Sequence, residues 1–192
     1  MRTALILSFL LAAGTAYAAP AKAPAPKTPA PKEVNSEEQL FRQLKQAQSS
    51  EDAHVIEEKL KLMFRPSGSP SVDLLMTRAE AAAAASDKKT AKKLVEAITS
   101  IAPTYAEGWH TRAAMEQADG DDTDALVSLQ KTVVLNPRHF AAMVELADML
   151  EDYGDKGGAL KLYRRALDLD PQLDVASRKV RELTTSVEGR DI

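Results

Sequence analysis

The chain has 192 residues, room for about one domain, and it contains no cysteine. Disulfides, thiolate metal sites and a cysteine nucleophile are therefore excluded, as is a lipid anchor on cysteine. From Val34 onward 21 Lys and Arg are outnumbered by 27 Asp and Glu. Such an acidic body argues against nucleic acid as a partner, because phosphates need a positive surface.

The first residues have the pattern of an export signal. Arg2 supplies a positive charge, residues 4–13 form an apolar run, and Ala16-Tyr17-Ala18 places small residues where signal peptidase cuts. The pattern predicts a signal peptide over residues 1–18 and a periplasmic location in a bacterium. Because the apolar run is too short to span a bilayer comfortably, we expect no stable membrane insertion.

Residues 19–34 predict a disordered linker rich in Ala, Pro and Lys. Five of the ten prolines lie between Pro20 and Pro31, and this composition favours extended polyproline II over a packed core. The segment can be interpreted as a solubilising spacer or as a basic tether attracted to anionic membrane or wall polymers.

Residues 35–71 predict a pair of helices. Ser36 with Gln39 forms a capping box that would open the first helix. Ser49 or Ser50 would start the second helix, which should end before the turn-rich residues 65–70. We interpret the pair as a degenerate, out-of-phase copy of the hairpins that follow.

Residues 72–173 contain a repeat of 34 residues. Four columns keep this spacing: Ala79, Ala113 and Ala147; Asp87, Asp121 and Asp155; Ala91, Ala125 and Ala159; and Pro103, Pro137 and Pro171. A fixed period of this length is typical of stacked helical hairpins. The sequence therefore predicts an all-α solenoid of three repeats, 72–105, 106–139 and 140–173.

Short signals set the ends of the predicted helices. Each hairpin should turn at Ser86-Asp87, Gly120-Asp121 or Gly154-Asp155, where glycine supplies a left-handed conformation and the aspartate caps the next helix. Residues 174–192 predict a capping helix and tail, with the helix running from Leu173 to about Thr185.

The repeats resemble the tetratricopeptide repeat (TPR) family. The third repeat fits that pattern best, with Met143, Ala147, Gly154-Asp155, Ala159, Tyr163, Ala166 and Pro171. Together with its leader, its spacer and its C-terminal tail, the chain is also similar to small alphaproteobacterial periplasmic TPR proteins. For those proteins roles in cell-envelope integrity are suspected.

The resemblance implies a protein-binding groove. In the TPR family the first helix of each hairpin lines a concave surface; the corresponding residues here are Asp73, Met76, Glu80, Glu107, His110, Ala114, Gln117, Val144, Asp148, Glu151 and Asp152. These positions are acidic and partly apolar and include no Lys or Arg. They predict a peptide or protein partner with basic residues flanking small apolar ones. The alternative interpretation is an ordinary solvated acidic face.

The three histidines do not predict a metal site. His54 with Glu57 and Glu58 fits a surface pair on one helix face. His110 should face the groove, where neighbouring carboxylates favour its charged form. His139 is at a repeat junction and is expected to be structural.

No sequence pattern predicts catalysis or a cofactor. Trp109 occupies a packing position of the repeat, and the aspartates of residues 119–124 lack the ligand pattern of a calcium loop and fit helix capping. We therefore expect a periplasmic interaction adaptor or scaffold in cell-envelope maintenance, and not an enzyme. The alternative is a periplasmic chaperone or assembly factor for envelope proteins.

Overall fold

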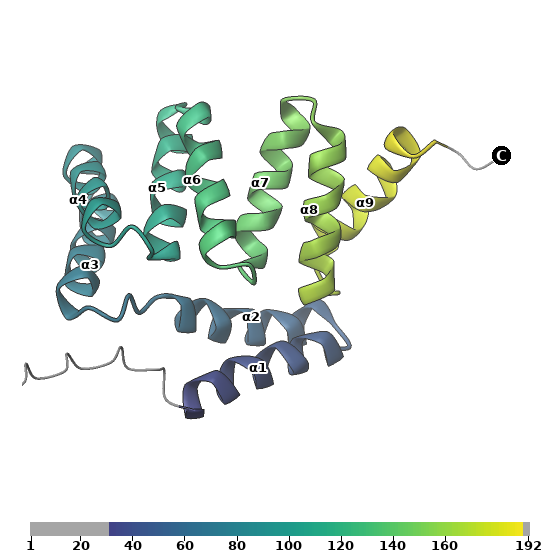
Figure 1. Cartoon of the computed structure of the whole chain (residues 1–192), viewed down its shortest axis with the longest axis horizontal. Coiled ribbons are helices and arrows are strands. Elements are labelled where there is room, and N and C mark those ends of the chain that lie inside the picture. The colour runs from purple at the N-terminus through teal and green to yellow at the C-terminus, as the bar shows by residue number, and fades with distance from the viewer. Residues whose placement is uncertain (1–30, 190–192) are drawn as a thin grey trace, which may run out of the picture.

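The computed structural model describes residues 31–189, which form nine α-helices and no β-strand within that range (Figure 1). The predicted all-α class is confirmed. The predicted signal peptide and residues 19–30 of the predicted linker lie outside the described residues. Within the described range no helix is both long and apolar enough to cross a bilayer.

Six helices form three hairpins that stand side by side. They are α3 (Pro70–Ala84) with α4 (Lys88–Ile101), α5 (Ala106–Asp119) with α6 (Asp122–Leu135), and α7 (Phe140–Asp152) with α8 (Lys156–Leu169). Figure 1 shows the hairpins in chain order, from teal to yellow-green, each beside the next. The helical-hairpin solenoid expected from the 34-residue period is therefore confirmed.

The alanine columns are buried positions of these hairpins. Ala79, Ala113 and Ala147 on the first helices are fully buried, and Ala91, Ala125 and Ala159 on the second helices are at most 2% exposed. Small side chains at these positions allow paired helices to approach closely, because protein interiors leave little room for added volume. Trp109 packs as predicted, with its indole N–H donating to the carbonyl oxygen of Pro103 at 2.9 Å.

The turns inside the hairpins use two devices. Gly120 and Gly154 end α5 and α7 with left-handed φ angles of 79° and 87°, which glycine adopts without steric cost. The side chains of Asp87 and Asp155 cap α4 and α8, each accepting from the backbone N–H three residues later, at 3.1 Å and 2.8 Å.

The predicted cap at Asp121 is wrong. Asp121 occupies the N-cap position of α6, but its side chain makes no capping hydrogen bond. Instead the ammonium group of Lys92 on α4 lies between Asp119 and Asp121, at 3.1 Å and 3.2 Å. The ammonium group of Lys92 competes with the backbone N–H groups of α6 for the Asp121 carboxylate, because it is within reach of both aspartates.

The N-terminal hairpin consists of α1 (Pro31–Gln46) and α2 (Ser50–Phe64). The start predicted for α1 at the Ser36 capping box is wrong, and residues 31–34 of the predicted linker are helical. Proline fits the first helical turn, where its missing N–H has no intrahelical partner to lose. Helix α2 begins as predicted, with the Ser49 hydroxyl accepting from the N–H of Asp52 at 3.1 Å.

This hairpin is not another member of the row, contrary to the interpretation as a degenerate repeat. Figure 1 shows α1 and α2 lying across one end of the other hairpins, below α5 to α8. Its buried residues Phe41, Leu44, Ala53 and Leu60 join one core with residues of α5 to α8. The cause is the connection after α2, where the Tyr105 hydroxyl donates to the Arg65 carbonyl and fixes the departing chain.

Helix α9 (Asp174–Val187) closes the other end of the solenoid, as predicted. Ala176 and Leu183 are buried in a cluster with Leu160 and Tyr163 of α8. The opposite side of α9 is exposed to solvent and charged, which a terminal helix requires.

Candidate protein-binding groove

The predicted groove residues lie on the first helices of the three hairpins. Asp73, Met76 and Glu80 are on α3; Glu107, His110, Ala114 and Gln117 are on α5; and Val144, Asp148, Glu151 and Asp152 are on α7. The three helices present one continuous face. The hydroxyl of Thr111 is 3.7 Å from the sulfur of Met76, and the side-chain amide of Gln117 is 3.1 Å from the sulfur of Met149.

The residues on α3 have structural roles. Met76 is only 5% exposed and packs mainly in the core, although it also lines a small recess beside Asp73. Asp73 accepts hydrogen bonds from both the backbone N–H and the hydroxyl of Ser67, at 2.8 Å and 2.6 Å. Both carboxylate oxygens of Glu80 are 2.7 Å from the guanidinium group of Arg65. These carboxylates hold the connection between α2 and α3.

An acid–histidine cluster occupies the middle of the predicted groove. Nε2 of His110 is 3.1 Å from both oxygens of Glu145, and its Nδ1 is 3.7 Å from Glu107. Burial alone would lower the pKa of His110, but these two carboxylates outweigh it and raise the pKa to about 9. These carboxylates favour the charged form of His110 at neutral pH, as the sequence led us to expect.

The carboxyl group of Glu107 is the counterpart of that histidine. Burial alone would raise its pKa, but hydrogen bonds from His110 and His139 lower the pKa of Glu107 to about 2. Nε2 of His139 is 3.3 Å from Glu107. Its Nδ1 accepts from the N–H of Ala142 at 3.1 Å, so His139 caps α7 and is structural, as predicted.

Glu107, His110 and His139 also bring ligand atoms within 4.8 Å of one another, the spacing of a metal site. The hydrogen bonds of His139 do not suit a metal ligand. Because Nδ1 accepts from a backbone N–H, the ring hydrogen is on Nε2, the atom that points at Glu107. For Nε2 to bind a metal ion, the ring hydrogen would have to move to Nδ1. There it would face the N–H of Ala142, and the two donors would repel each other. The cluster suits hydrogen bonding and ion pairing.

The carboxylates of α7 are also engaged. The Tyr163 hydroxyl donates to Asp148 and, at 3.3 Å, to Glu151. Lys179 of α9 is 2.9 Å from Glu151. The expectation of a groove without cations was therefore incomplete. Arg65 and Lys179, which lie outside the three lining helices, neutralise the groove carboxylates of Glu80 and Glu151. Asp152 is exposed.

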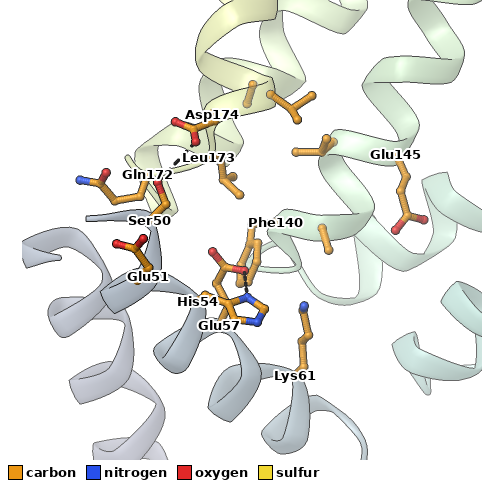
Figure 2. A pocket seen from close by; sticks show the side chains of 14 residues that line it. Ser50, Glu51, His54, Glu57, Lys61, Phe140, Glu145, Gln172, Leu173 and Asp174 are labelled. Atoms are coloured by element: carbon orange, nitrogen blue, oxygen red, sulfur yellow. Dashed lines mark hydrogen bonds and ion pairs between the residues drawn. The ribbon is translucent and has the colours of Figure 1, made fainter. Parts of the chain in front are cut away.

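An open cleft of about 630 Å³ lies between α2, α7 and α9. Figure 2 shows side chains of all three helices pointing into it. Phe140, Val144 and Leu173 contribute apolar surface, and the polar lining is formed by Ser50, Glu51, His54, Glu57, Lys61, Glu145, Gln172 and Asp174. Of the predicted groove residues only Val144 lines this cleft.

Sequence reasoning missed one wall of the cleft because it came from α2. His54 is correctly predicted as a surface residue near Glu57, with Nδ1 3.7 Å from that carboxylate, but both also face the cleft (Figure 2). The sequence signal for α2 as a helix was clear. Its position against α7 and α9 follows from contacts between residues far apart in the chain, such as Ser50 with Asp174.

Proteins similar to this chain carry the same repeat. No family model matches the chain. A TPR repeat-containing protein of Rhizobium etli is 29% identical over 152 residues, which cover 79% of this chain and 74% of that protein. The structure of MamA has the same fold, with a TM-score of 0.56 and 15% identity, covering 76% of this chain and 88% of MamA. The chain therefore has the fold of tetratricopeptide repeat solenoids.

Two structures similar to this chain contain peptides. The Yersinia enterocolitica type III secretion chaperone SycD, in complex with a peptide of the translocator YopD, has a TM-score of 0.55 and 16% identity, covering 62% of this chain and 95% of SycD. The first TPR of Spaghetti, bound to an HSP90 peptide, has a TM-score of 0.54 and 16% identity, covering 61% and 93%. TPR proteins are in general interaction scaffolds and not enzymes.

A second, smaller recess of about 400 Å³ lies between α3, α4 and α5. The predicted groove residue Ala114 lines it, together with Ala83 and Ala118. Alanine side chains leave the recess shallow and apolar. It lies at the opposite end of the solenoid from the cleft between α2, α7 and α9 (Figure 1).

Proposed function

We propose that this chain is an interaction protein whose cleft between α2, α7 and α9 binds an extended segment of a partner protein. The observation that carries the proposal is the cleft itself. Phe140, Val144 and Leu173 provide apolar surface for side chains to bury. Glu51 and Asp174 at its edge have no cationic partner among residues 36–189, so they are available to orient a basic group.

The chemistry of the cleft favours a partner segment with basic residues next to small apolar ones. Four carboxylates and a single lysine line the cleft, and that lysine, Lys61, is 2.7 Å from Glu58 on the same helix. A carboxylate ligand would be repelled. Peptides bound to similar folds support an extended segment as the ligand.

The predicted export signal and the resemblance to small periplasmic TPR proteins support a periplasmic location. We propose that the protein acts there as an adaptor or scaffold in maintaining the cell envelope. A chaperone or assembly factor would use the same cleft, but it would bind many clients briefly instead of one partner stably.

Photo-crosslinking in cells tests this function. A benzophenone amino acid at Val144 reports on the cleft, and the same residue at Val134, which is 77% exposed on α6, is the matched control. One dominant protein adduct from position 144 would support the adaptor and identify its partner. Many adducts from position 144 alone would support the chaperone. Identical adducts from both positions, or adducts only from 134, would rule out the cleft.

Charge reversal adds a second readout. Glu51→Lys places a cation at the cleft edge and should reduce the specific adduct. Asp52→Lys makes the same change of charge in the same turn of α2, outside the cleft lining, and should leave the adduct unchanged. Thermal unfolding of both variants checks that α2 stays folded, since both residues are exposed to solvent.

A further inference from the structure

A buried carboxyl group beside the cleft has one oxygen without a donor. Asp170 is fully buried in the loop after α8, where its Oδ1 accepts from the N–H of Gln172, a residue of the cleft lining. Within residues 36–189, Oδ2 of Asp170 is the only buried side-chain nitrogen or oxygen that lacks a hydrogen-bond partner. A carboxylate oxygen buried in this way needs a proton or a cation to offset its charge.

The group beside that oxygen is the carboxyl of Glu57 on α2. Ionised carboxylates only accept hydrogen bonds, so the two groups can bond to each other only while one of them holds a proton. Burial raises the pKa of Asp170 most, and the Glu57 carboxyl raises it further, to about 6. Glu57 lines the cleft, and Figure 2 shows its side chain beside His54. The pair therefore connects a proton-binding site in the loop to the cleft wall.

The loop itself does not require a carboxyl group at position 170. Asn136, at the equivalent position one repeat earlier, accepts the same hydrogen bond from the N–H of Arg138 at 3.0 Å without a charge. An amide at position 170 could do the same, and its NH₂ group could also donate to Glu57. The carboxyl group of Asp170 thus adds a negative charge beside the cleft that the loop geometry does not need.

The other charged groups around the cleft do not neutralise this pair. Lys61 is 2.7 Å from Glu58, and Glu145 is 3.1 Å from His110, which is not a lining residue. The side chain of His54 is 67% exposed, so solvent screens its charge. None of the lining residues therefore supplies a buried cation to the pair. The remaining charged lining residues are both acidic: Glu51 on α2 and Asp174 on α9.

We propose that Glu57 and Asp170 form the subsite for a basic side chain of the partner, whose positive charge takes the place of the proton that the pair binds in the free protein. The inference rests on the proposed function, because it treats the cleft as the partner's binding surface. Asp170 is not a lining residue, so the cation contacts Glu57 and acts on Asp170 through its charge. A nearby cation favours the ionised form of a carboxyl group. The proton then leaves the pair for the solvent.

Proton release makes the affinity depend on pH. With half-protonation near pH 6, binding should release about 0.9 proton at pH 5 and about 0.1 proton at pH 7. The ligand binds the deprotonated pair, so protons compete with it at low pH. The affinity should therefore be about tenfold lower at pH 5 than at pH 7.

Isothermal titration calorimetry on the full chain tests the subsite. The probe is a five-residue peptide with blocked ends, a central lysine and alanine elsewhere, and the matched control peptide carries acetyl-lysine. Titrations at pH 5, 6 and 7, in buffers of different ionisation enthalpy, give the affinity and the number of protons released. The lysine peptide should show the tenfold change and the proton release, and the control peptide should show neither.

Two variants assign the titration to the pair. Asp170→Asn should abolish the proton release and the pH dependence, and should lower the affinity at pH 7 about fivefold because one of two negative charges is lost. Asp168→Asn, at an exposed position of α8, removes the same charge and should leave all three quantities unchanged. Circular dichroism checks that both variants fold.

Each other outcome would overturn the subsite. A pH dependence that persists in Asp170→Asn would assign the titration to His54. Equal affinities of the two peptides would show that the cleft does not select a cation. Binding of the lysine peptide without proton release at pH 5 would show that Asp170 takes no part.

The failure of this proposal is distinguishable from the failure of the proposed function. A dominant adduct at position 144 in cells, together with any of these three outcomes or with no binding of either peptide at 10 mM, keeps the function and rejects the subsite. The absence of both a cleft-specific adduct and peptide binding would reject the function and the subsite together.

Discussion

The hairpin α1–α2 and the three hairpins of the solenoid are built from the same kind of helix but are held in place differently. In the solenoid each hairpin packs on its neighbour in sequence, through interactions that recur every 34 residues. The hairpin α1–α2 lies across the row and contacts the loops between repeats (Figure 1). Tyr105 bonds to the Arg65 carbonyl, His139 lies 5.3 Å from Phe64 between ring centroids, and Gln172 donates to the Ala47 carbonyl at 2.9 Å.

These contacts come from equivalent places in successive repeats. Tyr105 and His139 are 34 residues apart, and Gln172 is one residue before the next member of that series. Periodicity thus creates a row of loops, and different side chains on these loops fix one non-repeating hairpin. The comparison teaches that the repeats determine the solenoid, whereas single residues on its loops determine the cleft.

The largest expected effect comes from breaking the core that the two regions share. Leu60 of α2 is fully buried in the cluster that contains Leu129 of α6. Leu60→Ala should lower the free energy of unfolding by about 2–5 kcal/mol, because it removes apolar contacts and leaves a cavity. Urea unfolding followed by circular dichroism and by the fluorescence of Trp109, the single tryptophan, measures the loss.

The two probes also decide whether the regions unfold together. Trp109 lies in α5 and reports on the solenoid, while circular dichroism reports on all helices. Coincident transitions in Leu60→Ala would show one cooperative unit. A separate early transition by circular dichroism alone would contradict the shared core. Leu62→Ala, at a position 62% exposed on the same helix, is the control and should have little effect.

A second variant should strengthen the junction between the regions. Asp170 is fully buried in the loop after α8, where its Oδ1 accepts from the N–H of Gln172 at 3.0 Å. Burial, and then the neighbouring Glu57 carboxyl of α2, raise the pKa of Asp170 from 3.8 to about 6. The equivalent residue one repeat earlier is Asn136, which accepts the same hydrogen bond at 3.0 Å without a charge.

The sign of the pH dependence follows from that raised pKa. The contribution of Asp170 to stability is fully present below the pKa of its carboxyl group in the unfolded chain, near 4. That contribution is lost as the pH rises through the pKa of Asp170 in the folded protein, by up to about 3 kcal/mol. Asp170→Asn should remove this loss and stabilise the protein at pH 7 by about 1–2 kcal/mol. Urea unfolding between pH 4.5 and 6.5 measures it, in a window where His110 stays charged and Glu107 ionised.

The reciprocal exchange is the matched control. Asn136→Asp places a carboxylate at the same loop position, but there it is only half-buried and away from Glu57, so the pH slope of stability should stay nearly unchanged. An unchanged pH slope in Asp170→Asn would show that the buried carboxyl does not limit how α2 packs on the loop after α8.

The fold of the solenoid was predictable because its determinants are local and repeated. Ala79 and Ala91 pack within one hairpin, and the same pairing recurs at Ala113 and Ala125. The orientation of α1–α2 was not predictable, because it depends on contacts such as Arg138 with Glu38, 100 residues apart. No periodicity in the sequence encodes a contact of that kind.

The candidate site was predictable only in part, for the same reason. The charge of His110 followed from carboxylates within the repeats, at Glu107 and Glu145. The pairing of Glu80 with Arg65 and of Glu151 with Lys179 did not, because these cations lie outside the repeats. The wall of the cleft on α2 was missed because it depends on the same long-range packing.

The smallest expected effect sharpens the comparison inside the solenoid itself. The three hairpin turns share one hydrogen-bond pattern, but the left-handed residue is Ser86 in the first and glycine at 120 and 154 in the others. A side chain at the φ of 61° found for Ser86 costs about 1–2 kcal/mol. Ser86→Gly removes that cost, offset by about 0.4–1 kcal/mol of added chain entropy in the unfolded state.

Ser86→Gly should therefore stabilise the protein by about 0.5 kcal/mol, and Gly154→Ala should destabilise it by about 1 kcal/mol or more. A Cβ at Gly154 meets no atom within 4 Å, so only the backbone conformation opposes it. Thermal unfolding of both variants gives the two signs. Destabilisation by Ser86→Gly would mean that the serine side chain offsets its own strain. The first turn would then have its own stabilising contact. Turns at equivalent positions of the repeats would differ in their side-chain contacts, as the loops that contact α1 and α2 do.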